Sequence, residues 1–266
     1  MTDESAFRML RVQRIEPHVL VVTLAREEVR NALNTEMGQE LVALFEAVAV
    51  GVWQARCIVL TGAGDKAFCA GGDLKERKGM TDAEWQLQHL VFERMIRALV
   101  DCPVPVIAAV NGAAFGGGCE IAGACDFVYA TEEARFALSE VTLGIMPGGG
   151  GTQTLPRAIG ERRAKELILA GRSFTARQAE AWGLVNACFP RDRLEGAVLE
   201  VAATIARNAP IAVRQAKQSI HRGLQMSISD GLAFEIEAYN RLVPTQDRRE
   251  GVLAFNEKRP PRFQGH

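Results

Sequence analysis

The sequence predicts an α/β protein whose parallel sheets are covered by helices and followed by a helical carboxy-terminal region. Two observations support this class. Short apolar runs such as Cys57–Leu60 and Val106–Val110 stand singly between helical patterns in the first two thirds of the chain, which is typical of buried parallel strands. From about residue 151, helical periodicity dominates. We therefore place an α/β core at 1–190 and a helical region at 191–266.

Within the core, the elements follow from periodicity and turn residues. Phe7–Ile15 and His18–Leu24 flank Glu16-Pro17 and predict a hairpin. Residues 35–50 have the spacing of an amphipathic helix. Helical spacing returns at 81–100, where we expect one apolar face. That face is expected to consist of Leu87, Val91, Met95 and Leu99. The remaining expected strands of the core are 126–130 and 135–138.

Prolines divide the last third of the chain into helices. The expected helices are 161–170, 175–182, 192–208, 210–222, 228–242 and 246–256. Their apolar faces include Leu194, Val198 and Val201 in one helix and Leu232, Ile236 and Tyr239 in another. Because little chain remains to cover these faces, we expect the helical region to pack on other subunits.

Composition excludes several classes of protein. The 266 residues are 48% hydrophobic and 24% charged, with a formal net charge of −1. This balance gives no bulk attraction to nucleic acid or to an anionic membrane. No run approaches the roughly 18 apolar residues that a membrane span needs. The acidic start, Met1–Ser5, is not followed by an apolar stretch, so we expect no secretory signal and a cytoplasmic location.

Cysteine and histidine spacing predicts neither a metal site nor a disulfide framework. The six cysteines form no C-x-x-C pair, and the four histidines lie far apart. We expect reduced, mostly buried thiols.

Glycine clusters carry the chemical information. Gly62–Gly64 formally opens a dinucleotide fingerprint, but Phe68–Gly72 follows it where a helix is required. Gly72 and Gly117 each precede a plausible helix start. Two such turns facing each other aim two N–H donors at one oxygen, which is an oxyanion hole. The alternative is that these glycines only allow tight packing.

Two glutamates lie in nearly uncharged segments. Glu120 follows Gly118 by two residues, and Glu140 stands between apolar runs. Each alone is more readily a structural or exposed group. Together, and each near a glycine turn, they are candidates for paired acid and base chemistry. We expect Glu120 to be ionised by N–H groups at its own turn and Glu140 to be neutral.

At these residues the sequence resembles the crotonase (enoyl-CoA hydratase/isomerase) family. The matching segments are Phe68–Lys75, Pro105–Glu120 and Phe136–Arg157, with Leu24–Arg26, Asn31–Leu33 and Phe255–Arg259 toward the ends. The resemblance spans essentially the whole chain. It implies a spiral of ββα turns, a helical trimerisation region, and assembly as a homotrimer or a dimer of trimers. It also implies an acyl-CoA substrate, in which coenzyme A is part of the substrate and no further cofactor is needed.

The resemblance also assigns roles to residues. It places the oxyanion donors on the N–H groups of Gly72, where alanine is commoner, and Gly117. It places the catalytic carboxyl groups on Glu120 and Glu140. The residues implied along the coenzyme-A path are Arg26, Ala70, Asp73, Leu74 and Lys75. Phe255 and Lys258 would close the nucleotide end, either of their own chain or of a neighbouring subunit. The alternative for these two residues is a packing or surface role.

Because both glutamates are present, the resemblance favours a hydratase that adds water in syn geometry to a 2-enoyl-CoA thioester. The subgroups most similar are methylglutaconyl-CoA hydratases and general enoyl-CoA hydratases. An isomerase or a carnitinyl-CoA-type dehydratase is the alternative. A more remote alternative is RNA binding, which needs a basic exposed helix. The helix at 35–50 is acidic, and the candidate basic surface is a small set of residues, Arg214, Lys217, His221 and Arg222.

The preference for one acyl group over another is expected to depend on the turn after Gly72, because the family places this turn beside the acyl chain of the substrate. Lys75, Arg77 and Lys78 lie there. A carboxylate on the acyl chain needs a cation or donors to offset its desolvation, and Arg77 offers the better fork. The alternative is a solvated basic turn.

Overall fold

The computed structural model describes residues 7–266, apart from the side chain of Glu16. The acidic start, Met1–Ser5, lies outside the described residues. The strands are β1 (Leu10–Glu16), β2 (Val19–Leu24), β3 (Cys57–Gly62), β4 (Ala67–Cys69), β5 (Val106–Val110), β6 (Ala113–Phe115), β7 (Phe127–Thr131), β8 (Arg135–Ala137), β9 (Ser173–Thr175) and β10 (Ala187–Phe189).

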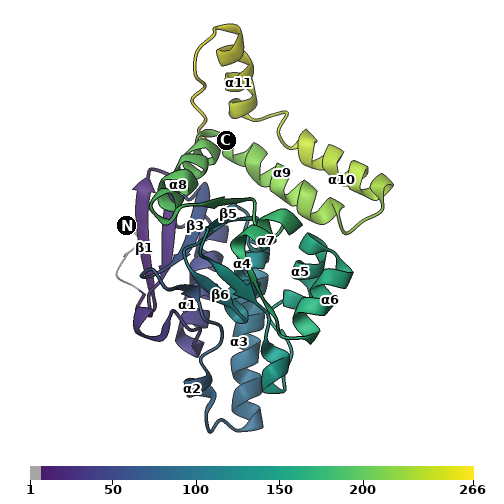
Figure 1. The fold of residues 1–266 in the computed structure, drawn as a ribbon. Coiled ribbons are helices and arrows are strands. Elements are labelled where there is room, and N and C mark those ends of the chain that lie inside the picture. The colour runs from purple at the N-terminus through teal and green to yellow at the C-terminus, as the bar shows by residue number, and fades with distance from the viewer. Residues whose placement is uncertain (1–6) are drawn as a thin grey trace.

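Helices connect and cover these strands (Figure 1). The α-helices are α1 (Thr35–Ala49), α2 (Leu74–Arg77), α3 (Asp82–Val100), α4 (Gly117–Ala124), α5 (Gly151–Ile159), α6 (Glu161–Leu169), α7 (Ala176–Trp182), α8 (Arg191–Arg207), α9 (Pro210–Gly223), α10 (Ile228–Asn240) and α11 (Gln246–Asn256). Two 3₁₀ turns, η1 (Glu27–Val29) and η2 (Glu140–Leu143), complete the set.

The strands form two sheets whose order explains the spiral. The larger sheet has the order β1-β2-β3-β5-β7-β10 and the smaller one β4-β6-β8-β9. Only the β1–β2 and β8–β9 pairs are antiparallel. From β3 to β8, each repeat sends one strand to the larger sheet and the next to the smaller, and a helix or helical turn follows. This is the predicted succession of ββα turns.

The main core fills the space between the larger sheet, the smaller sheet and the helices α1, α3, α4 and α5 to α7. Its largest fully buried side chains are Phe45, Phe68, Phe136 and Phe174. The six cysteines are free thiols, five of them buried and Cys188 half-buried, as the sequence predicts. Burial of this apolar surface is the main stabilising contribution to the fold.

Helix α8 covers the other face of the larger sheet. Leu194 and Val198 pack against Val59 and Ile107 in a second core cluster. The expectation that this helix lacks covering chain is therefore wrong, because the sheet itself covers it. The division at residue 190 stays a prediction, although α8, just beyond it, packs directly on the sheet.

The expected apolar face of α3 is partly wrong. The buried side chains of α3 are Gln88, Phe92, Met95, Ile96 and Leu99. Leu87 is 64% exposed, because the core-facing stripe is rotated by about one position from the one expected. A helix at 151–159 and the short strands β9 and β10 were also not expected from the sequence.

Helices α9, α10 and α11 extend away from the body of the molecule (Figure 1). Lys217 ties α9 to the sheet by donating to Asp126 at 2.7 Å and to the Val104 carbonyl at 2.9 Å. Leu232, Ile236 and Tyr239 on α10 remain exposed. Within residues 7–266, no single helix is long and apolar enough to cross a membrane; the pair α8 and α9, bent by 108°, passes on length and composition alone.

Candidate active site

Pairing of β4 with β6 places two glycine turns side by side. The strands are parallel, with Cys69 opposite Ala114, so the turns that follow them emerge at the same edge. Gly71 has φ +96°, and a Cβ there would lie 2.9 Å from the Phe115 carbonyl oxygen. A larger residue at Gly71 would therefore clash with the turn after β6.

The two turns carry free N–H groups. Leu33 donates to the Gly71 carbonyl at 2.8 Å and accepts from Asp73 at 2.9 Å, which holds the first turn on both sides of Gly72. Within the described chain, the N–H groups of Gly72 and Gly117 have no acceptor. A Cβ on Gly117 would lie 3.9 Å from the Gly72 nitrogen. Two adjacent unpaired donors are what an oxyanion hole requires.

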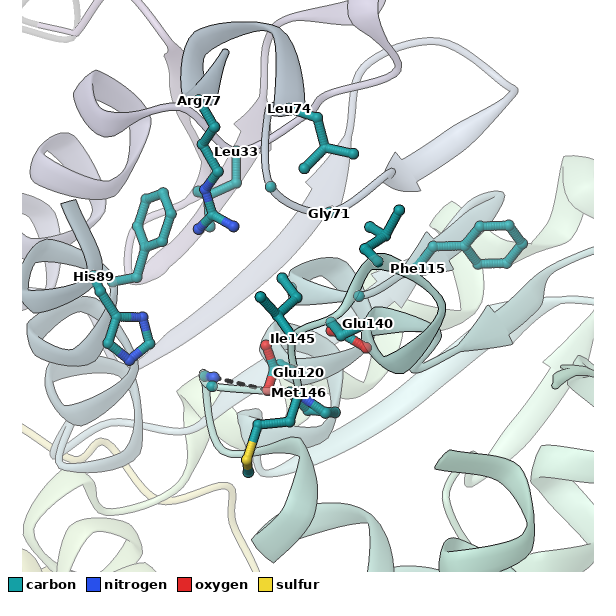
Figure 2. Close-up of a pocket in the computed structure, with 18 of the residues that line it drawn as sticks. Leu33, Gly71, Leu74, Arg77, His89, Phe115, Glu120, Glu140, Ile145 and Met146 are labelled. Carbon is teal, nitrogen blue, oxygen red and sulfur yellow. Dashed lines mark hydrogen bonds between the residues drawn. The ribbon is translucent and has the colours of Figure 1, made fainter. Parts of the chain in front are cut away.

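A cavity of about 880 Å³ opens beside these turns. One wall is α3, through Trp85, Phe92 and Ile96, and another is the loop that carries Ile145 and Met146. Gly72, Gly117, Glu120 and Glu140 all line it, so the four predicted catalytic residues meet in one place. Figure 2 shows both glutamates together on one side of this cavity.

Glu120 is held by N–H groups from a glycine run that lies elsewhere in the sequence. It stands in the first turn of α4 and is 5% exposed. Its Oε1 accepts from Gly149 at 2.7 Å, the bond dashed in Figure 2, and from Gly151 at 2.9 Å. The expectation that its own turn supplies these donors is wrong. The donors instead come from the turn that begins α5, where Gly150 has φ +96°.

Burial raises the pKa of Glu120 to about 7. The N–H groups of Gly151 and Gly149 act in the opposite direction, because they stabilise the anion, and the charge of Glu140 adds to the increase. A carboxyl group with a pKa near neutral is suited to exchange a proton during a reaction.

Glu140 begins η2, and two residues, Leu138 and Ser139, separate it from the end of β8. Burial raises the pKa of its carboxyl group as well. Its Oε2 is buried and has no hydrogen-bond partner in the described chain. Nothing in the protein stabilises a full charge on that oxygen, which favours the protonated acid.

Arg26 and Asp73 pair with each other and do not line the cavity. Arg26 donates to Asp73 Oδ2 at 2.9 Å and to the Ala32 carbonyl at 2.6 Å. Asp73 also caps α2 by accepting from Lys75 and Glu76. Burial raises the pKa of Asp73, but the bonds from Arg26 and the two N–H groups lower it further, and the pKa stays below its ordinary value. The pair holds the turn that presents Gly72.

The other predicted contact residues are divided between two places. Ala70 and Leu74 line the cavity, whereas Lys75 is exposed beside it. Phe255, which is 84% exposed, and Lys258 lie on and just after α11, at the opposite end of the molecule from α2 and α3 (Figure 1). A single chain does not bring these two residues to the cavity.

Gly149 and Gly151, which hold Glu120, are not predicted from the sequence. A Cβ on Gly149 would lie 2.7 Å from Glu120 Oε2, and one on Gly151 would lie 2.8 Å from the Leu138 side chain. Glycine is needed at both positions to let the Glu120 carboxylate approach the backbone. The signal in the sequence is the run of four glycines at 148–151 directly before a helix.

Comparison with known proteins agrees with this geometry. The sequence model of the family described as "Enoyl-CoA hydratase/isomerase" matches residues 14–266. The chain is 41% identical to the 2,3-dehydroadipyl-CoA hydratase of Escherichia coli, covering 94% of this chain and 96% of that one. It is 37% identical to the human mitochondrial methylglutaconyl-CoA hydratase, covering 100% of this chain and 79% of that one.

A solved structure shows the same fold. The crystal structure of an enoyl-CoA hydratase from Bacillus anthracis superposes with a TM-score of 0.95 at 44% identity, covering 97% of this chain and all of that one. The chain therefore belongs to the enoyl-CoA hydratase/isomerase family, a family of enzymes. The resemblance found in the sequence and the predicted crotonase fold are confirmed.

The pair of Arg26 and Asp73 gives a test of stability. Arg26→Met should lower the free energy of unfolding by about 1–3 kcal/mol at neutral pH, since it leaves a largely buried carboxylate without its cation. The lowered pKa of Asp73 means that the contribution is present above about pH 4 and is lost as the pH falls through the folded-state value. Urea unfolding at several pH values measures both effects.

Arg94→Met is the matched control, because Arg94 and Glu46 form an exposed pair that contributes little. Unchanged stability of Arg26→Met together with a raised KM for every CoA thioester would instead identify Arg26 as a coenzyme contact.

Proposed function

We propose that this protein is an enoyl-CoA hydratase that adds water to a 2-enoyl-CoA thioester. The observation that carries the proposal is one cavity containing two unpaired backbone N–H groups and two carboxyl groups with raised pKa values. The donors suit the oxygen of a polarised thioester. The carboxyl groups suit the two proton transfers that hydration of a double bond requires.

In the proposed mechanism, the thioester oxygen accepts from the N–H groups of Gly72 and Gly117. Glu120, as the carboxylate, removes a proton from water while the water oxygen bonds to C3. The electrons of the double bond move toward the thioester and give an enolate-like oxygen that the two donors stabilise. Glu140, as the acid, delivers a proton to C2. Water is consumed, one C–O and one C–H bond form, and no electron acceptor is needed.

The two glutamates differ in what supports each role. Glu120 accepts two N–H bonds, which favours its anion and therefore the base. Glu140 has a buried oxygen without a partner, which favours its acid. This assignment keeps the one ionised and one protonated group expected from the sequence, although burial raises both pKa values.

The alternatives have less support. An isomerase or a carnitinyl-CoA-type dehydratase would use the same donors, so product analysis must separate them from a hydratase. For RNA binding, the basic set on α9 is already engaged in part, because Lys217 pairs with Asp126 and Arg222 with Asp101. An acidic α1 surface also disfavours a polyanion.

Two relatives have names that specify acyl groups carrying a carboxylate, methylglutaconyl and 2,3-dehydroadipyl. We therefore include 3-methylglutaconyl-CoA as a candidate substrate and expect its kcat/KM to exceed that of crotonyl-CoA. The proposed reaction is redox-neutral and its proton carriers are side chains, so it needs no cofactor besides the coenzyme A of the substrate. The cytoplasmic location stays a prediction.

Replacing either acid tests the proposal directly. Glu120→Gln and Glu140→Gln should each lower kcat for hydration by ~10²–10⁴, the usual worth of a positioned acid or base. The double variant should lose far less than the product of the two effects, because both groups serve one transition state. Hydration of the best enoyl-CoA is followed by loss of enoyl absorbance, with thermal unfolding as the control. Near wild-type turnover in either variant would rule out that residue's role.

The pH profile tests the assignment of base and acid. We expect kcat/KM to rise through the pKa of about 7 at Glu120 and to fall at higher pH as the acid is lost. In Glu140→Gln, the falling limb should disappear, because the group whose proton is lost at higher pH has been removed, while the rising limb at Glu120 remains. A falling limb that persists in this variant would show that another group is the acid.

We also propose assembly into trimers or dimers of trimers. The support is the apolar face of α10, where Ile236 is 57% exposed, together with Leu253 and Phe255 on α11. Such a face is costly to leave in water. Light scattering at micromolar concentration should give a trimer or hexamer mass, and Ile236→Asp should shift it toward the monomer. A wild-type protein that is monomeric at this concentration would contradict the proposal.

A further inference from the structure

Arg77 projects from α2 into the cavity, opposite the two glutamates (Figure 2). Its Nε donates to Gln88 Oε1 at 2.8 Å. The guanidinium carbon lies 4.3 Å from the centre of the Trp85 ring and 5.6 Å from that of Phe92. One hydrogen bond and two aromatic faces therefore fix the plane of the guanidinium group.

Gln88 aims this group. It is 4% exposed, and its Nε2 donates to Thr35 Oγ1 at 2.8 Å and to Glu76 Oε2 at 2.7 Å. Glu76 in turn accepts from the Thr35 backbone at 3.0 Å. With its amide nitrogen occupied on one side, Gln88 must present its oxygen to Arg77. The chain from α1 through α3 to α2 thus holds Arg77 in one orientation.

The terminal nitrogens of Arg77 have no protein partner. Within residues 7–266, neither terminal nitrogen has an acceptor, and no carboxylate lies within ion-pair distance of Arg77. Of the described residues lining the cavity, Arg77 is the one lysine or arginine; His89, Glu120 and Glu140 are the other ionisable groups. The charge of Glu76 acts on Arg77 from beyond ion-pair distance. A half-buried cation without a direct ion-pair partner is costly, and its free fork matches a carboxylate.

The position of the fork limits the length of its ligand. A Cβ placed on Gly72 would lie 3.5 Å from the guanidinium carbon and 3.6 Å from both terminal nitrogens. The fork therefore lies against the turn whose N–H group is the proposed thioester donor. An anion bound to it would be separated from the thioester oxygen by only a short acyl chain.

We propose that Arg77, aimed by Gln88, forms a subsite for a carboxylate at the far end of a short acyl chain. The subsite makes the enzyme selective for enoyl thioesters of short dicarboxylic acids over neutral ones of similar size. It rests on the proposed function for the identity of the thioester. The recognition itself is a binding property and can be measured without turnover.

Binding of two unreactive analogues tests the subsite. Glutaryl-CoA and butyryl-CoA differ by a carboxylate in place of a hydrogen at C4, and neither has a double bond to hydrate. In Arg77→Met, the Kd for glutaryl-CoA should rise about 10- to 150-fold, the range expected for a charged hydrogen bond. The Kd for butyryl-CoA should change by less than about threefold. Calorimetry on the full chain measures both values.

Three further variants sharpen the result. Arg77→Lys keeps the charge and should retain part of the selectivity. Gln88→Met should weaken the binding of glutaryl-CoA more than that of butyryl-CoA, because the Arg77 guanidinium is then free to turn away from the ligand. Lys78→Met removes an exposed cation next to Arg77 in the sequence and should leave both Kd values within roughly twofold. Equal losses for both ligands in Arg77→Met would identify a coenzyme contact and overturn the subsite.

Kinetics with glutaconyl-CoA and crotonyl-CoA, the matched unsaturated pair, separate the subsite from the reaction. Arg77→Met should lower kcat/KM for glutaconyl-CoA by a similar factor and spare crotonyl-CoA. A drop in kcat on both substrates would make Arg77 part of the catalytic machinery and would contradict the proposal. If the wild type hydrates neither of these substrates nor 3-methylglutaconyl-CoA, the proposed function fails, and the analogue binding still decides whether the carboxylate subsite exists.

Discussion

The parallel pairing of β4 with β6 is the constraint on which the candidate site depends. Only three residues long each, these strands bring two turns distant in sequence to one sheet edge. The two turns therefore lie within van der Waals distance of each other. This is possible because residues 71 and 118 are glycines, and a Cβ at either position would clash with the neighbouring backbone. Two unpaired N–H groups follow from this packing without any side chain.

Side chains supply the charged and ionisable groups of the cavity and of the turn beside it, and each of these side chains is positioned by a different set of contacts. Glu120 is held by N–H groups at the start of α5. Asp73 is paired with Arg26 and caps α2. Arg77 is oriented through Gln88. Around the cavity, the unpaired polar atoms include the N–H groups of Gly72 and Gly117 and the Oε2 atom of Glu140. In the proposed function, the substrate would supply their partners.

Much of the fold could be predicted from the sequence, because strands such as β3 and β5 are continuous apolar runs and helices such as α1 have a clear period. The two glutamates and two donor glycines could be named because they lie inside highly specific motifs. The N–H groups that hold Glu120 could not be identified from the sequence, because Gly149 is 29 residues away and only the tertiary fold brings it near. The pairing of Arg26 with Asp73, 47 residues apart, was hidden for the same reason.

The short loop from Gly144 to Gly151 has two duties at once. Ile145 and Met146 form part of the cavity wall, and a few residues later the N–H groups of Gly149 and Gly151 donate hydrogen bonds to the carboxylate of Glu120. A replacement in this loop that moves its backbone also moves the N–H groups that stabilise the anion of Glu120. If Glu120 is the base, as proposed, substrate range and catalytic rate are therefore coupled through this loop, and enlarging the cavity there also changes the environment of the Glu120 carboxylate.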